Sequence, residues 1–157
     1  MNDHGREPPC TQHASFSIDR RLSAPPAKVY AAFANAAAKG KWFARSDGLK
    51  LIRNDFDFRV GGEERVDGRW QSGVVSSFRA SYRDIVPERR IVYAYDLFLD
   101  ERKISVSLAT IEFLPDGAGT RLKLTEQGAF LDGYDDAGSR ERGTNELMDA
   151  MARSLAD

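Results

Sequence analysis

The feature that most constrains the fold is a change of hydrophobic period along the chain. From Leu49 to about residue 128, apolar residues recur at every second position, in segments separated by short turns. Such alternation predicts β-strands with one apolar face. Strands joined by short turns must pair antiparallel, because parallel pairing needs a long crossover. The sequence therefore predicts an antiparallel meander that is apolar on one face.

Each expected strand is identified by its alternating apolar residues. A first strand precedes the meander at residues 15–22, and later ones are expected at residues 49–56, 56–60, 69–85, 91–97, 103–113 and 120–128. In the 103–113 strand, Ile104, Val106 and Leu108 are expected to share the apolar face. We count about six to seven strands in all.

Two segments have helical spacing instead. The first of them comprises residues 23–43. Pro25 and Pro26 suit its first helical turn, and Gly40 is expected to divide it into two short helices. A long last helix is expected from about Ser139. A one-sided sheet needs a cover, and this helix is the only long amphipathic element. The predicted fold is α+β: a curved sheet wrapped around the C-terminal helix, an arrangement that often leaves a cavity for an apolar ligand.

Length and charge set the class of protein. The chain has 157 residues and a formal net charge of -1, so we expect one domain and no field that attracts nucleic acid. Its apolar runs are too short to span a membrane. Residues 1–14 are expected to form a flexible leader without the order of a secretory signal, and residues 15–157 a single domain. Cys10 is the one cysteine, which fits a cytoplasmic protein; monomer and homodimer both remain open.

The pair Gly61-Gly62 raises the question of phosphate binding. A phosphate-binding loop needs a following helix with Lys and Ser or Thr, whereas Glu63 and Glu64 follow here and would repel phosphate. We interpret the pair as a tight turn or bulge between strands.

Catalytic and metal-binding side chains are scarce in the expected domain. Both histidines, His4 and His13, lie in the leader with the cysteine. No metal site or cofactor is therefore expected, and nucleophilic catalysis lacks its usual base. Any catalysis has to rest on carboxylate, Arg and Tyr groups.

Glu126 is the candidate acid or base. It follows Leu122 and Leu124 on one face of its strand, which directs it toward the core, where burial would raise the pKa of its carboxyl. The alternative is a place at the strand end, open to water or paired with an arginine such as Arg142. In either case we expect it at the cavity. The other expected lining residues are Trp42, Trp70, Phe78, Tyr93, Tyr95, Val106, Leu108, Phe130, Thr144, Met148 and Met151.

Four segments together resemble the START-like SRPBCC superfamily, and within it the bacterial proteins similar to the C-terminal domain of the activator of heat-shock-protein-90 ATPase. They read SAPPAKVYAAFANAAAKGKWF, FDFRVGGEERV, VPERRIVYAYD and GTRLKLTEQGAFLDG. The resemblance covers about residues 15–156. It implies a helix-grip fold with a hydrophobic cavity. Many relatives carry Trp after the glycine of the last helix, whereas Thr144 follows Gly143 here.

The resemblance does not imply one activity, since such proteins include ligand binders, cyclases and co-chaperones. We favour binding of an apolar or amphipathic small molecule. A cyclase- or dehydratase-like enzyme using Glu126 is the second hypothesis. The third is a protein-binding module with a chaperone partner, which requires an exposed apolar patch on the outer face of the sheet.

Overall fold

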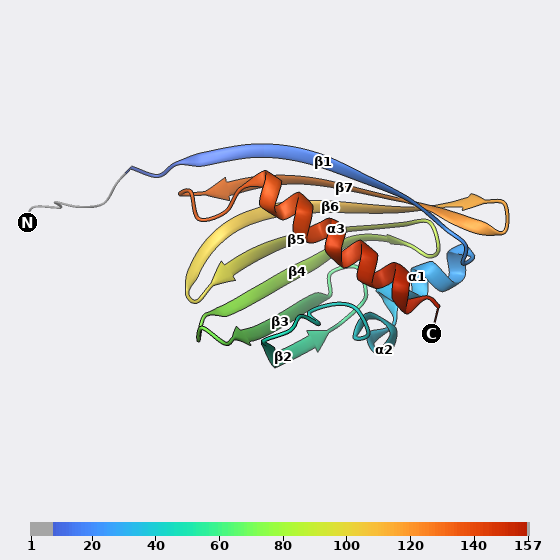
Figure 1. Ribbon diagram of the computed structural model, residues 1–157. Helices are drawn as coiled ribbons and strands as arrows, with labels where there is room; N and C mark the ends of the chain where they lie inside the picture. The colour runs from blue at the N-terminus through green and yellow to red at the C-terminus, as the bar shows by residue number, and fades with distance from the viewer. Residues whose placement is uncertain (1–7, 157) are drawn as a thin grey trace, which may run out of the picture.

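The computed structural model describes residues 8–156 as a seven-stranded antiparallel sheet with three helices (Figure 1). The strand order is β1-β7-β6-β5-β4-β3-β2, so the meander is continuous and β1 adds to its far edge. The predicted helix-grip fold is confirmed. In chain order the elements are β1 (Thr11–Leu22), α1 (Pro26–Ala34), α2 (Ala36–Lys39), β2 (Leu49–Phe56), β3 (Glu63–Trp70), β4 (Val75–Val86), β5 (Arg90–Leu99), β6 (Arg102–Asp116), β7 (Gly119–Leu131) and α3 (Ala137–Ser154).

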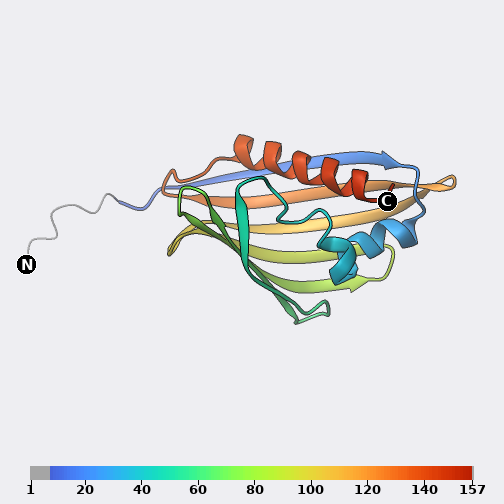
Figure 2. The same ribbon diagram turned by 60° about the horizontal axis from the view of Figure 1, so that its bottom comes forward.

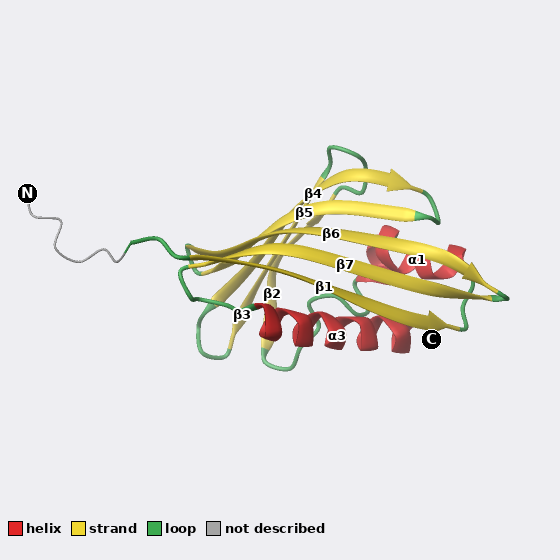
Figure 3. Ribbon diagram, turned by 90° about the horizontal axis from the view of Figure 1, so that it is seen from above, coloured by secondary structure: helices red, strands yellow, loops and turns green. Residues whose placement is uncertain are grey.

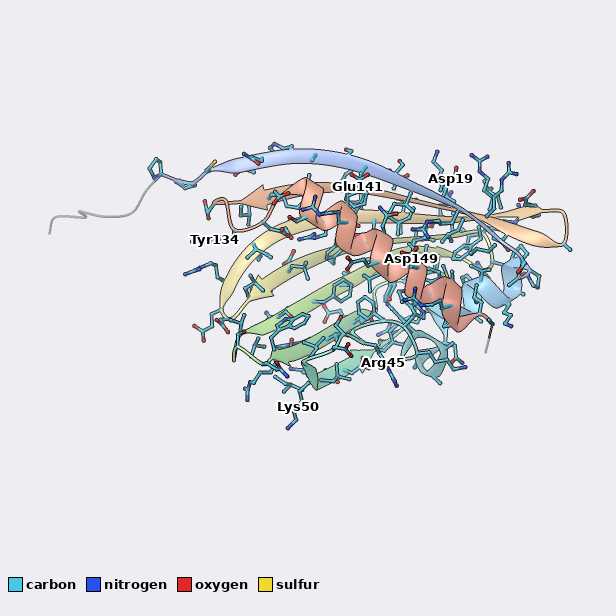
Figure 4. All side chains as sticks on the ribbon, in the orientation of Figure 1. Asp19, Arg45, Lys50, Tyr134, Glu141 and Asp149 are labelled. Carbon is cyan, nitrogen blue, oxygen red and sulfur yellow. The ribbon has the colours of Figure 1, made fainter. Side chains whose placement is uncertain are left out.

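The sheet curves around α3, which lies diagonally across its concave face, while α1 and α2 lie at the end where the chain terminates (Figures 1 and 2). Seen from above, α3 runs beside β1 (Figure 3). An ion pair of 2.5 Å joins Arg20 of β1 to Asp149 of α3, which is labelled in Figure 4. The Asp136 side chain caps α3 by accepting from the Ser139 N–H at 2.9 Å. No helix in the described range is long and apolar enough to cross a membrane.

The core is largest where α1 meets the sheet. Phe33 and Trp42 pack edge to face with ring centroids 5.1 Å apart, and the Trp42 indole N–H donates to the Ala32 carbonyl at 2.9 Å. The buried apolar residues around them include Val29, Ile91, Ile111, Phe113, Leu122, Leu124 and Met151. This packing fixes the helices against the inner face of the sheet.

Several boundaries differ from the sequence prediction. Residues 57–60, predicted as part of a strand, lie in the turn before β3. The segment 69–85 is not one strand, because a turn at residues 71–74, with Gly73 at φ 91°, separates β3 from β4. Strand β1 begins at Thr11, where it pairs with Leu131, so the last four residues predicted as leader belong to the sheet. Residues 1–7 of that leader lie outside the described residues.

The two short helices divide at Asn35 rather than at Gly40. Asn35 has an extended backbone, and its side chain caps α2 by accepting from the Ala38 N–H at 3.0 Å. Gly40 instead ends α2. The capping side chain decides the break, and it places Lys39 at the last position of α2.

Gly61 and Gly62 form a turn, as the sequence predicts. Gly61 has φ 83°, and its N–H donates to the Tyr82 carbonyl at 2.8 Å. A Cβ on Gly62 would lie 2.1 Å from the Asp57 carbonyl oxygen, so only glycine fits. The pair returns the chain from β2 so that β3 runs back along β2, and its hydrogen bonds to Tyr82 fix the turn to β4.

Candidate functional site

A pocket of about 320 Å³ lies between α3 and the concave face of the sheet. Strands β3 to β7 supply its floor, and α3 together with the segment after α2 covers it. Its lining is mainly aromatic and apolar, with few polar groups. Such a composition is typical of sites for small organic ligands.

Eight of the twelve residues predicted as lining face this pocket. They are Trp42, Trp70, Phe78, Tyr93, Tyr95, Glu126, Thr144 and Met148. Phe130 and Met151 are buried but do not line it. Val106 and Leu108 lie on the outer face of the sheet, 41% and 38% exposed, so the prediction that they line the pocket is wrong.

A β-bulge in β6 explains that error. Leu97 pairs with Ser105 while Phe98 pairs with Lys103, so Ile104 is an extra residue in the ladder. The alternation that starts at Ile104 therefore shifts by one position. Ser105 and Ser107 face inward and are buried, in the places that the sequence pattern gave to Val106 and Leu108.

The two serines contribute to a buried group of polar side chains that we name the Arg140 cluster. It consists of Arg140, Tyr95, Glu126, Ser105, Ser107 and Asp135. Tyr95 donates to Glu126 Oε1, and Arg140 Nη1 donates to the Tyr95 hydroxyl at 3.1 Å. The Tyr95 hydroxyl thus bridges the Arg140 guanidinium and the Glu126 carboxyl by hydrogen bonds. Arg140 Nη1 and Glu126 Oε1 are 3.8 Å apart.

Arg140 is held by hydroxyl and carboxylate oxygens. Its Nη2 donates to Ser105 Oγ at 2.7 Å and to Asp135 Oδ2 at 2.8 Å. The alternative considered for Glu126 was pairing with an arginine such as Arg142, but Arg142 donates to Ser139 Oγ at 3.1 Å. Arg140 extends the stripe of Thr144 and Met148 by one helical turn, and that i, i+4 spacing is the signal that identifies it.

Glu126 lies within its strand, not at the end, because β7 continues to Leu131. Its residue is 4% exposed. Burial raises the pKa of the Glu126 carboxyl above its usual range, while the hydrogen bond from Tyr95 and the charge of Arg140 oppose that shift. A carboxyl with a raised pKa can take a proton from a bound group or give one to it.

A second buried group, which we name the Lys39 cluster, consists of Lys39, Glu64 and Tyr82. Lys39 Nζ lies 2.6 Å from Glu64 Oε1, and the Tyr82 hydroxyl donates to the same oxygen at 2.7 Å. Glu64 is 3% exposed and belongs to β3. Sequence reasoning missed this pair, although Glu64, Val66 and Gly68 alternate onto the inner face.

Tyr93 lies between the two clusters. Its ring is 5.8 Å from that of Tyr82 and 5.9 Å from that of Tyr95. Burial, together with the charges of Glu126 and Glu64, raises the pKa of the Tyr93 hydroxyl well above its usual range. Tyr82 and Tyr95 each donate to a carboxylate, whereas the Tyr93 hydroxyl has no hydrogen-bond partner within residues 8–156.

The site offers hydrogen bonding and proton transfer. Within the described chain, His, Cys, Asp and Glu form no group of three or more that would hold a metal ion. An ion pair lies on each side of Tyr93. Lys39 is paired with Glu64 on one side, and Arg140 with Asp135 on the other. The arrangement can orient a ligand and exchange a proton with it.

Comparison with known proteins places this fold in a family. Residues 23–156 match the family described as Activator of Hsp90 ATPase homolog 1-like protein. No curated protein matches the chain.

Several solved structures resemble the chain along nearly its whole length. An uncharacterised protein from Rhizobium leguminosarum is 39% identical, with a TM-score of 0.91, over 96% of this chain and 99% of that one. A protein from Rhizobium loti is 41% identical, with a TM-score of 0.86, over 92% and 99%. An AHSA1-like protein from Aeromonas hydrophila shares the fold at 16% identity, with a TM-score of 0.69, over 91% and 92%. The chain therefore belongs to the family of Activator of Hsp90 ATPase homolog 1-like proteins.

Proposed function

We propose that this protein binds an uncharged, largely apolar small molecule in the pocket under α3. The ligand carries one hydroxyl or carbonyl group, which bonds to Tyr93 beside Glu126, and its apolar part lies among the aromatic rings. A pocket of about 320 Å³ is of the size that fits a small organic ligand.

The unpartnered Tyr93 hydroxyl carries this proposal. The buried phenols of Tyr82 and Tyr95 hydrogen-bond to carboxylates, whereas Tyr93 is half-buried and its hydroxyl opens onto the pocket. The Tyr93 hydroxyl is left to bond with whatever enters the pocket. It marks the point where the polar group of a ligand belongs.

The charges of the two clusters support an uncharged ligand. Lys39 is paired with Glu64, and Arg140 is paired with Asp135 at 2.8 Å. A charged ligand group would therefore enter a low-dielectric site without an unpaired counter-ion, and its desolvation would be uncompensated.

Binding can be tested with 3-phenylpropan-1-ol by calorimetry. We expect measurable binding to the wild type and a loss of about fivefold in affinity in Tyr93→Phe, because one hydrogen bond is worth about 1 kcal/mol. The charged analogue 3-phenylpropionate is the matched ligand control and should bind more weakly.

A blocking variant separates the pocket from other surfaces. Thr144 is 7% exposed and lines the pocket, so Thr144→Trp should fill it and abolish binding, while Val106→Ser on the outer face should leave binding unchanged. Full binding by Thr144→Trp, with its fold verified by circular dichroism, would rule out this pocket as the site.

A second candidate function is protein binding through the outer face of the sheet. Val106 and Leu108 project there side by side and supply the exposed apolar surface that this function requires. The family description makes an Hsp90-type chaperone the partner to test. We expect the double variant Val106→Ser and Leu108→Ser to lose the chaperone in a pull-down if the outer face is the interface; unchanged capture would refute it.

A further inference from the structure

Lys39 is a buried lysine whose amine borders the pocket. It ends α2, and its residue is 9% exposed. It lines the main pocket and also a smaller one of about 80 Å³ that lies between α2, β2 and β3. Its Nζ lies 4.5 Å from the ring centroid of Phe43 and 6.0 Å from that of Phe78, and both rings line the main pocket.

The Glu64 carboxyl is placed to exchange a proton with this amine. Glu64 Oε1 lies 2.6 Å from Lys39 Nζ and also accepts from Tyr82. The Glu64 side chain is 2% exposed and that of Lys39 is 11% exposed. The lysine is thus the member of the pair that an incoming molecule can reach, while the carboxyl stays shielded behind it.

The surroundings favour the neutral amine more than water does. Burial lowers the pKa of the Lys39 amine, and the neighbouring Glu64 charge opposes that shift. The faces of Phe43 and Phe56 lie 4.5 and 5.3 Å from Nζ and, like the Glu64 charge, favour the ammonium, whereas burial is the largest effect and disfavours it. Moving the proton from Nζ to Glu64 gives an uncharged amine beside an uncharged acid. This is the state in which a lysine is a nucleophile.

We propose that Lys39 forms a reversible imine with an apolar aldehyde or ketone held in the pocket, with Glu64 as the proton carrier. The proposal rests on the proposed function, since the carbonyl compound has to occupy the same pocket. It deepens that function by naming the class of ligand and its point of attachment.

The atoms and charges of the step balance. The ammonium gives a proton to the Glu64 carboxylate, and the free amine attacks the carbonyl carbon. Proton transfer within the adduct gives a neutral carbinolamine. Glu64 then returns its proton to the carbinolamine hydroxyl, which leaves as water. The net change joins the protonated amine and the carbonyl compound into a protonated imine and water, with the Glu64 carboxylate restored.

The test is reductive trapping with 3-phenylpropanal. The full chain is incubated at neutral pH with the aldehyde and sodium cyanoborohydride, and modified lysines are located by peptide mass spectrometry. An ordinary lysine is unprotonated in roughly 1 of 2,500 molecules under these conditions. We expect Lys39 to be modified at least about tenfold faster than the neighbouring exposed Lys41.

Two variants and a competitor complete the design. Lys39→Arg keeps a cation for Glu64 and should lose the fast modification. Glu64→Gln removes the proton carrier and should slow the modification of Lys39 at a pH at which the amine is unprotonated in both proteins, with the fold of the variant verified by circular dichroism. Unreactive 3-phenylpropan-1-ol should compete with the trapping of Lys39 but not of Lys41.

The outcomes separate the two proposals. If the alcohol binds in the pocket but Lys39 is modified no faster than Lys41, the imine proposal is wrong and the binding function stands. If neither the alcohol nor the aldehyde occupies the pocket, both proposals fail.

Discussion

The Lys39 cluster and the Arg140 cluster border the same pocket, but they differ in how the buried cation is neutralised. In the first, cation and carboxylate are in direct contact at 2.6 Å, and a phenol supports the carboxylate. In the second, Tyr95 stands between Arg140 and Glu126, which are 3.8 Å apart, and Asp135 is the direct partner of the arginine. Direct contact neutralises the charges of Lys39 and Glu64. The bridging Tyr95 hydroxyl keeps Arg140 away from Glu126, so a charge on the Glu126 carboxyl is only weakly compensated.

The largest difference between the clusters should appear when one cation is removed. Lys39→Met leaves Glu64 charged and buried without its partner, so the free energy of unfolding should fall by about 3–5 kcal/mol in urea titrations. Adding Glu64→Leu to that variant should restore much of the loss, because no unpaired charge remains. A double variant as unstable as the single one would show that the pair is not coupled.

Removing Arg140 should cost less. Arg140→Met should lower the free energy of unfolding by about 2–3 kcal/mol, because Glu126 can take up a proton and the Asp135 side chain is 19% exposed and partly solvated. Arg142→Met on the exposed side of α3 is the matched control and should change little. Equal effects of the two variants would contradict the assignment of Arg140 as the buried cation.

Tyr82 of β4 and Tyr93 of β5 are direct partners across the two strands and give a finer comparison. Tyr82→Phe removes a hydroxyl that donates to Glu64 and should cost about 1 kcal/mol in thermal or urea unfolding. Tyr93→Phe removes a hydroxyl without a protein partner and should leave stability nearly unchanged. If Tyr93→Phe were the more destabilising of the two, its hydroxyl would not be reserved for a ligand.

The smallest expected effect is a pH dependence. The folded-state pKa of Glu126 lies above the ordinary value of 4.5, so the folded protein holds this proton more tightly than the unfolded chain. The stabilisation is complete below the ordinary pKa and is lost as pH rises through the folded-state pKa. Glu126→Gln cannot ionise, so Tm of the wild type should fall relative to that variant over this range. A constant difference in Tm would refute a buried, perturbed carboxyl.

The fold was predictable because it depends on repeated signals. Alternation along β5 and β7 placed Tyr93, Tyr95 and Glu126 on the inner face, and the structure agrees. The break between α1 and α2 was misplaced because a side-chain cap at Asn35 outweighs the glycine. Where a single local contact decides the position of a boundary, the hydrophobic period of the sequence does not predict that position.

The site was only half predictable for a related reason. Its tyrosines and its carboxyl lie on regular strands, whereas the cations come from helix ends whose position depends on tertiary packing. Lys39 ends a helix of four residues, and nothing in its local pattern indicates burial. Arg140 lies one helical turn before Thr144 and Met148, and the sequence analysis did not include it in the stripe that faces the sheet.

The extra residue at Ile104 shows how the pocket could tolerate a change in chain length. Without it, the pairs Phe98–Lys103 and Leu97–Ser105 would be successive pairs of a regular ladder, so Ser105 and Ser107 would keep the inward side on which they accept from Arg140. The bulge adds a second inward side chain, since Ile104 and Ser105 are neighbours in sequence and both are buried. A relative that lost this residue would repack that end of β6 while the oxygen partners of Arg140 stayed in place.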